Sequence, residues 1–294
     1  MDASIVAFEN SNSTESELLL MEYDDNFKKI AKTKTSFFKN GAYIINFELV
    51  KNKEIAKLFW EIEKKSIKIS QISKVRQGLI AYGVGGGIPK QNKKMKDDKI
   101  YHSEKKLDDS YYKYLESNDI HRYKFNWSGQ FLKYGDNLFR KREFNIYQGE
   151  RLLIKQIPSD PPYCISATYT NETILNDVNS IIIHDIKIIN PKSLVAILNS
   201  KLISFWFILK FGKMQRSIFP QFKINELAQF PIPKNISDNR MLKKLANLAN
   251  EKMGVKNSDK VDNEIDTLVY ELFKLDKKDI LTVENYLNNF GKKN

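Results

Sequence analysis

Cysteine and histidine are scarce in this chain of 294 residues, which has one cysteine and three histidines. The single cysteine, Cys164, excludes an internal disulfide framework and is typical of a protein kept in a reducing cytoplasm, where we expect this one to be. Cys164 has apolar neighbours and no nucleophile signature, which favours a buried structural thiol. His102, His121 and His184 are far apart and have no CxxC or HxxxH partner, so the sequence predicts no metal site.

Long uncharged apolar runs are also missing. The most apolar window, residues 194–211, is interrupted by Asn199, Lys201 and Lys210, whereas a membrane span needs roughly 18–20 apolar residues. The first 17 residues, MDASIVAFENSNSTESE, lack the basic start and cleavage site of a secretory signal. We therefore expect a soluble, globular protein of one large domain or two, with no membrane partner.

Acidic residues are outnumbered, because 48 Lys and Arg stand against 36 Asp and Glu, which gives a net charge of +12. This excess favours a polyanionic partner, since cations that neutralise phosphates release condensed counterions. A lysine-rich, AT-rich genome would also raise lysine, and it would raise asparagine and isoleucine too. Charge alone leaves both explanations open.

The hydrophobic pattern predicts a mixture of strands and helices. Apolar, β-branched stretches predict strands at 3–9, 151–157 and 181–189 and an extended segment at 164–169. A second apolar stretch, 42–50, precedes an amphipathic helix at 54–66, whose apolar face holds Ile55, Leu58, Phe59 and Ile62. After Pro191, residues 192–212 are typical of one apolar helix closed by glycine.

The end of the chain has a different pattern. Pro231 and Pro233 predict a rigid extended connector. Beyond it we expect three helices, the first capped by Ser237 or Asp238 and the third opened by Asp276 and Asp279. The sequence thus predicts a mixed α/β (α+β) fold, with one domain at 1–235 and a C-terminal helical region at 236–294.

One short motif suggests catalysis. Asp160, Pro161, Pro162 and Tyr163 spell the DPPY signature with which amino-group DNA methyltransferases hold a flipped base. Such an enzyme also needs a glycine-rich turn for S-adenosylmethionine, followed by a helix and an acidic residue about 20 positions on. The only glycine-rich run, 83–87, continues as Ile-Pro-Lys-Gln-Asn-Lys-Lys, which is not a helix start. A tight turn between strands is therefore favoured, and catalysis by Asp160 and Tyr163 stays an alternative.

A nuclease pattern is weaker. Glu63 and Glu104 are each followed two positions on by lysine, as in some carboxylate nucleases. This spacing is frequent by chance in a lysine-rich chain, so we assign no nuclease site to it.

Several segments, in order, carry a resemblance to a known family. They are DASIVAFEN, QGLIAYGVGGGIPKQ with YHS after it, YGDNLFRKREFNIYQGERLLIKQI, ISATYTNE, LVAILNSKLISFWF, SIFPQFKINELAQFPIP and IDTLVYELFKLDKKDI. From about residue 3 to 285 the chain resembles the C-terminal specificity region of TaqI-like adenine DNA methyltransferases, including the fused type IIG restriction-modification enzymes.

The resemblance implies a DNA target-recognition domain. The catalytic half, which uses S-adenosylmethionine, precedes this region in such enzymes and is absent here, so this chain is expected to be a separate subunit or a fragment without a cofactor of its own. Its partners would be double-stranded DNA and a catalytic methyltransferase domain or subunit, and a nuclease could be associated. The segment 151–169 matches a strand, a turn and a strand of the specificity region, which makes DPPY a coincidence.

The residues themselves point to DNA independently. Arginine can pair bidentately with guanine, and Gln or Asn with adenine, each pair giving ~1–3 kcal/mol of discrimination. The glycine-rich loop at 83–96 allows close backbone approach, and 122–142 mixes aromatic with basic residues. Candidate contacts are Arg76, Gln77, Lys90, Gln91, Asn92, Lys93, Lys94, Arg122, Tyr123, Lys124, Trp127, Tyr134, Arg140, Lys141, Arg142, Lys155 and Gln156.

Other interpretations remain for Trp127 and Tyr134 and for the function itself. Trp127 and Tyr134 also fit packing positions, and any one lysine fits a solvated surface. A divergent methyltransferase and a protein-interaction module, basic only through genome bias, remain alternative functions.

Overall fold

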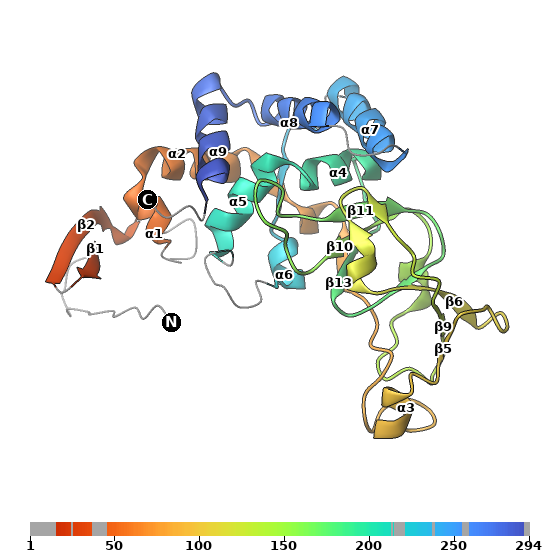
Figure 1. Cartoon of the computed structure of the whole chain (residues 1–294). Helices are drawn as coiled ribbons and strands as arrows, with labels where there is room; N and C mark the ends of the chain where they lie inside the picture. The colour runs from red at the N-terminus through yellow and green to blue at the C-terminus, as the bar shows by residue number, and fades with distance from the viewer. Residues whose placement is uncertain are drawn as a thin grey trace. The chain divides into compact units, whose positions relative to one another are not determined.

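A computed structural model describes residues 16–24, 26–36, 46–212, 214, 221–236, 239–254 and 259–290. Helices and strands both occur, which confirms the mixed fold (Figure 1). The chain divides into two compact units, Met1–Trp60 and Glu61–Asn294. The predicted strand at 3–9 lies outside the described residues.

The first unit contains a hairpin and the start of a helical segment. Strands β1 (Glu17–Asp24) and β2 (Asn26–Lys34) pair antiparallel, with a register shift between Leu20 and Met21. Helix α1 (Phe47–Lys51) is capped by Asn46, and α2 (Lys53–Lys64) follows and continues past residue 60. The predicted amphipathic helix is thus confirmed as α2, and its four expected apolar residues are buried.

The second unit is built on a four-stranded antiparallel sheet in the order β11-β10-β13-β4. Its strands are β4 (Lys74–Gln77), β10 (Arg151–Lys155), β11 (Ala167–Thr170) and β13 (Ser180–His184). Leu152, Leu153 and Ile154 are consecutive and all buried, so both faces of the sheet are covered. The strand predicted to reach residue 189 ends at His184, because Asp185 and Ile188 have positive φ, which breaks an extended backbone.

A smaller sheet covers one face of the first and shares its core. Its four strands lie in the order β12-β6-β9-β5. They are β12 (Leu175–Asn176), β6 (Tyr111–Leu115), β9 (Phe131–Lys133) and β5 (His102–Ser103). Strands β7 (Ile120–His121) and β8 (Lys124–Phe125) form a further pair. Leu153 and Ile182 of the large sheet belong to the same apolar cluster as Leu115 and Leu132 of the small one. Helix α3 (Lys93–Asp97) lies beyond the small sheet, on the side away from helices α7 (Asn239–Gly254) and α8 (Asp259–Leu272) (Figure 1).

The long apolar helix predicted at 192–212 is two helices, so that prediction was wrong in one respect. Helices α4 (Pro191–Leu198) and α5 (Lys201–Phe211) are bent by 61° at Asn199 and Ser200. The Asn199 side chain accepts from the Ala167 amide and donates to its carbonyl, while Ser200 caps α5. These side-chain bonds to backbone groups compete with a continuous helix. Gly212 closes α5 in the left-handed conformation, as expected.

No single helix in the described part of the chain has the length and apolarity to cross a membrane. The pair α4 and α5 passes the same test only when taken together, across its bend.

The proline-rich connector is extended, as predicted, and it is also a strand. After helix α6 (Ile224–Leu227), β14 (Pro231–Pro233) pairs antiparallel with β3 (Ser66–Lys68). Prolines are tolerated there because the strand belongs to a two-stranded pair and has one edge without a sheet neighbour.

Three helices end the chain, as predicted: α7 (Asn239–Gly254), α8 (Asp259–Leu272) and α9 (Lys277–Asn289). Asp276 and Asp279 form the capping box of α9, which confirms that start signal, while Ser237 and Asp238 lie outside the described residues. Helix α7 packs on α4, and α8 and α9 pack on α5. The domain boundary near residue 235 stays a prediction.

Candidate nucleic-acid interface

The glycine-rich loop is an ordered turn held by the side chain of Gln91. That side chain is 2% exposed; its Oε1 accepts from the Gly83 amide at 2.8 Å, and its Nε2 donates to the carbonyls of Ala81 and Asn137 at 2.9 and 2.7 Å. The backbone closes the loop, with Gly85 N donating to Gln91 O and Gln91 N to Gly86 O. Gln91, a predicted base reader, therefore has its amide committed inside the protein.

The glycines are needed because the loop lies directly on another segment. A Cβ atom at Gly83 or Gly86 would come within 2.6 or 2.4 Å of the Phe139 ring. Gly87 has φ +81°, a conformation that side chains other than glycine rarely adopt. The close backbone approach predicted for this loop is thus made to Phe139 within the chain.

The same packing brings together cations that are 50 residues apart in sequence. Ile80, just before the loop, exchanges two backbone hydrogen bonds with Arg140, and Ile88 N donates to Asp136 O at 2.7 Å. Lys90, Lys93 and Lys94 lie in the second half of the loop, the last two on α3, and all three are exposed, as is Arg140. Among the described residues none of these four has an ion-pair partner, so their charges face solvent.

The other residues of the basic run are partly occupied. Lys141 pairs with Asp136, and Arg142 Nε donates to the Gln77 carbonyl at 3.3 Å. The Tyr134 hydroxyl donates to the Arg142 carbonyl, and its ring packs against Phe144 with centroids 4.9 Å apart. Tyr134 is therefore a packing residue in the structure.

Three candidates lie at one end of the large sheet. Lys155 pairs with Ser180 and Gln77 with Ile181, so β10 and β4 flank the start of β13 there. The Gln77 amide donates to Val178 O at 2.7 Å, whereas Arg76 is exposed and Lys155 half-buried. Since β4 leads through Ile80 to the glycine-rich loop, this sheet end adjoins the loop. We define the interface cations as six residues of these segments whose charge has no ion-pair partner among the described residues: Arg76, Lys90, Lys93, Lys94, Arg140 and Lys155.

The remaining predicted DNA contacts either make contacts within the protein or lie outside the segments that carry the interface cations. Asn92 caps α3 by accepting from Met95 N, and Gln156 is buried. Trp127 donates to Gln130 O at 2.8 Å and packs on the apolar core shared by the two sheets, which agrees with the packing role considered for it from the sequence. Lys124 is exposed on β8.

Arg122, another predicted DNA contact, is a structural cation. Its Nη2 lies 2.9 Å from Asp262 Oδ1 and also donates to Asn199 O, and its guanidinium lies 3.8 Å from the Tyr163 ring centroid. Lys252 binds the other oxygen of Asp262 at 2.8 Å. Arg122 thus ties α8 to the turn that carries the DPPY motif, and its neighbour Tyr123 is buried.

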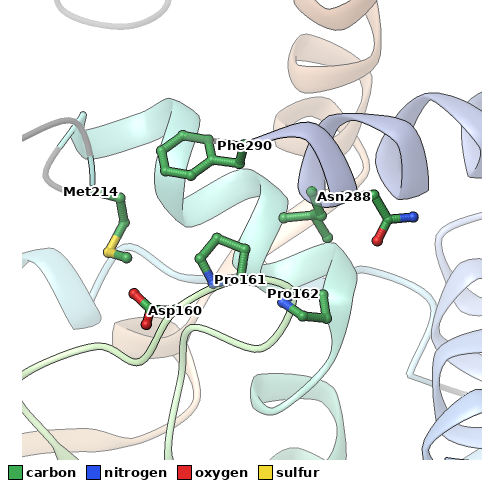
Figure 2. A pocket seen from close by; sticks show the side chains of 7 residues that line it. Asp160, Pro161, Pro162, Met214, Asn288 and Phe290 are labelled. Carbon is green, nitrogen blue, oxygen red and sulfur yellow. The ribbon is translucent and has the colours of Figure 1, made fainter. Parts of the chain in front are cut away.

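The tyrosine of the DPPY motif, Tyr163, packs against Arg122 and α8. The Tyr163 hydroxyl donates to Asp266 Oδ2 at 2.9 Å, and Arg122 covers the ring. Asp160, Pro161 and Pro162 instead line a hollow of about 390 Å³ at the end of α9, beside Met214 and Phe290 (Figure 2). Tyr163 does not line that hollow, so tyrosine and aspartate do not face one shared base-sized site here.

Burial of Asp266 has a consequence for pH. Desolvation raises the pKa of this carboxyl from 3.8 to about 6, against hydrogen bonds from Lys201 N and Tyr163 that lower it. The folded state then binds more protons than the unfolded chain between pH 4 and 6, so this group's contribution to stability is present at low pH and is lost as pH rises through that window.

Between pH 4.5 and 7.5 we expect the loss to be roughly 2 kcal/mol and to be missing in Asp266→Asn. Urea unfolding of the protein and the variant at pH 4.5 and 7.5 measures it, and Glu251→Gln, an exposed site on α7, is the control. An identical pH dependence in protein and Asp266→Asn would contradict the raised pKa.

Among the described residues, no group of three His, Cys, Asp or Glu side chains could hold a metal ion. Cys164 is buried as predicted, and burial raises the pKa of its thiol to about 12. Glu63 accepts from Trp206 Nε1 at 2.6 Å and pairs with Lys210, whereas Glu104 is exposed. The histidines stay apart; His102 Nδ1 lies 2.9 Å from the Tyr82 hydroxyl.

Sequence reasoning missed two features of this region. Val84 and Ile88 of the glycine-rich loop are exposed, although aliphatic residues usually pack inside. Arg151 is fully buried and donates to the carbonyls of Gly149, Glu172 and Ile174, with desolvation lowering its pKa to about 10. The sequence did hold a signal for Arg151, because this arginine stands in an otherwise apolar strand. It held no signal that Val84 and Ile88 would be exposed.

Known proteins resemble this chain at two levels. Residues 112–232 match the family described as the TaqI-like C-terminal specificity domain. A Methanocaldococcus jannaschii protein named "Putative type II restriction enzyme and methyltransferase RM.MjaORFECS2P" is 29% identical over 203 residues. That alignment covers 65% of this chain and 17% of the relative, so the chain spans less than a fifth of the relative's length.

Solved structures with a partial likeness come from restriction-modification proteins. The type IIL enzyme MmeI, solved in complex with DNA, has a TM-score of 0.42 at 9% identity, over 76% of this chain and 36% of that one. The type IIG endonuclease BpuSI has a TM-score of 0.45 at 12% identity, over 84% and 35%. The HsdS subunit from Thermoanaerobacter tengcongensis has a TM-score of 0.36 at 6% identity, over 76% and 51%.

The family match includes the small sheet from β6 onward, the basic run with Arg140, and the large sheet from β10 to β13. Residues 112–232 of this chain therefore match the TaqI-like C-terminal specificity domain.

Proposed function

We propose that this chain recognises the DNA target of a type II restriction-modification adenine methyltransferase. The observation that carries the proposal is the specificity-domain match over 112–232, the segment that supplies Arg140 and Lys155. A catalytic half supplied elsewhere would bind S-adenosylmethionine and transfer the methyl group, and this chain would hold that half over its site. Such work on the chromosome would place the chain in the cytoplasm.

The charge arrangement supports the proposal. The interface cations come from β4, the glycine-rich loop, the segment after β9 and the end of β10, which are joined by backbone hydrogen bonds and strand pairing. Cations without carboxylate partners are free to neutralise phosphates, and phosphate contacts set the register of a protein on a duplex. Arginine also offers bidentate pairing with guanine.

We expect duplex binding to weaken steeply with salt. If five of the six interface cations reach phosphates, the plot of log K against log salt has a slope of about −4 to −5. Titration of the whole chain with a 30-base-pair duplex across a salt series measures this slope. A methyl-transfer assay with labelled S-adenosylmethionine on the same sample should give no product.

Two results would contradict the proposal. A slope near zero would mean that phosphate contacts do not drive binding and would favour a protein-interaction module. Methyl transfer by this chain alone, abolished by Tyr163→Ala, would mean that the DPPY motif is an active site.

A further inference from the structure

The tip of the glycine-rich loop presents two aliphatic side chains to solvent. Ile88 is 73% and Val84 65% exposed, and Ile88 is the most exposed large hydrophobic residue of the described chain. Between 83 and 89 the loop reads GVGGGIP, so it carries no polar side chain. The nearest amide side chain, Gln91, is turned inward.

The exposure of these two residues follows from how the loop is held. Backbone hydrogen bonds join Gly85 to Gln91, Gln91 to Gly86 and Ile88 to Asp136, and the Phe139 ring lies against Gly83 and Gly86. The loop cannot turn its aliphatic side chains inward without breaking these contacts. A preorganised loop also loses little conformational entropy when it binds a partner.

Two of the interface cations flank the apolar tip along the chain and at the base of the loop. Lys90 follows Ile88 by two positions, and Arg140 is bonded to Ile80 at the base of the loop. Cations beside an apolar tip complement a partner with an anionic exterior and an apolar interior. In duplex DNA the apolar surfaces are the base faces and the thymine methyl groups, and both are reached through a groove.

We propose that Val84 and Ile88 contact base pairs: the loop enters a groove, and the two side chains pack on apolar base surface while Lys90 and Arg140 bind the flanking phosphates. The proposal rests on the DNA-recognition function proposed above. Because the loop has no polar side chain at its tip, it distinguishes sequences by thymine methyl groups or by how easily a base step opens.

The test begins with a duplex enriched by the whole chain from a randomised pool. Affinity for that duplex and for a scrambled one is then measured for the unchanged protein, Ile88→Ala, Val84→Ala and Ile88→Val. Leu281→Ala is the matched control, since Leu281 is 60% exposed on α9. Thymine-to-uracil replacement in the enriched duplex tests methyl contact, and 2-aminopurine fluorescence tests opening of a base step.

We expect Ile88→Ala and Val84→Ala each to weaken binding of the enriched duplex about tenfold, with Ile88→Val intermediate. The salt slope should stay unchanged, because no phosphate contact is lost. The uracil effect or the fluorescence rise should be absent in Ile88→Ala, and Leu281→Ala should match the unchanged protein.

Unaltered affinity and unaltered discrimination in both alanine variants, with normal salt-dependent binding, would overturn this inference and leave the proposed function standing. A failure of the unchanged protein to bind any duplex would overturn both.

Discussion

Replacing Lys90, Lys93, Lys94 and Arg140 by alanine together is expected to weaken duplex binding roughly 1,000-fold at 0.15 M salt and to flatten the salt slope by about 3 to 4. The four side chains are exposed and have no ion-pair partner within the described residues, so they are available to release counterions from phosphates. Binding isotherms across the salt series measure both quantities.

The control variant removes four positive charges from the C-terminal helices. Lys243, Lys244, Lys260 and Lys277 are exposed on α7, α8 and α9, and α7 and α8 lie at the opposite end of the second unit from α3 (Figure 1). Their joint replacement by alanine also takes four charges from the net +12. Equal weakening in both variants would show that net charge, and no local interface, drives binding.

Asp262→Ala is expected to destabilise the protein by roughly 3–5 kcal/mol. The carboxylate pairs with Arg122 at 2.9 Å and with Lys252 at 2.8 Å, and Lys252 and Asp262 are both buried. Removal of the acid takes the carboxylate away from Arg122 and from Lys252, which is buried. Urea unfolding at pH 7.5, followed by circular dichroism, measures the loss.

Two companion variants make this result specific. Asp259→Ala, at the exposed start of the same helix, should cost less than about 1 kcal/mol through the helix dipole. Replacement of Arg122, Lys252 and Asp262 by apolar residues of similar size should recover most of the loss, since buried ion pairs are often exchangeable for apolar packing. An Asp262→Ala variant as stable as Asp259→Ala would contradict a structural role for this triad.

Local sequence signals predicted much of the secondary structure. The apolar stripe from Ile55 to Ile62 predicted α2, and Asp276 with Asp279 predicted the start of α9. These features depend on neighbours within four residues, where helical periodicity and capping act. The family resemblance, too, was carried by segments in order along the chain, and the matched range of 112–232 lies inside the range proposed from them.

Where a distant segment competes with local preference, the sequence was a poor guide. The helix expected at 192–212 breaks because Asn199 bonds to the backbone of Ala167, 32 residues earlier. The strand expected to reach 189 stops where Asp185 adopts positive φ. Hydrophobic pattern alone could not show either, since both depend on contacts or conformations that the pattern does not encode.

The sequence by itself determined which chemistry this chain can offer: excess cations, an apolar glycine-rich loop and a segment that resembles a specificity domain. Only the tertiary structure decided which side chains remain available for a partner. Arg122 and Lys90 are both cations on polar stretches, yet Arg122 is paired with Asp262, 140 residues away, whereas Lys90 faces solvent. The physical reason is that a side chain's partners are set by long-range packing, which brings a carboxylate to one cation and leaves the other in water.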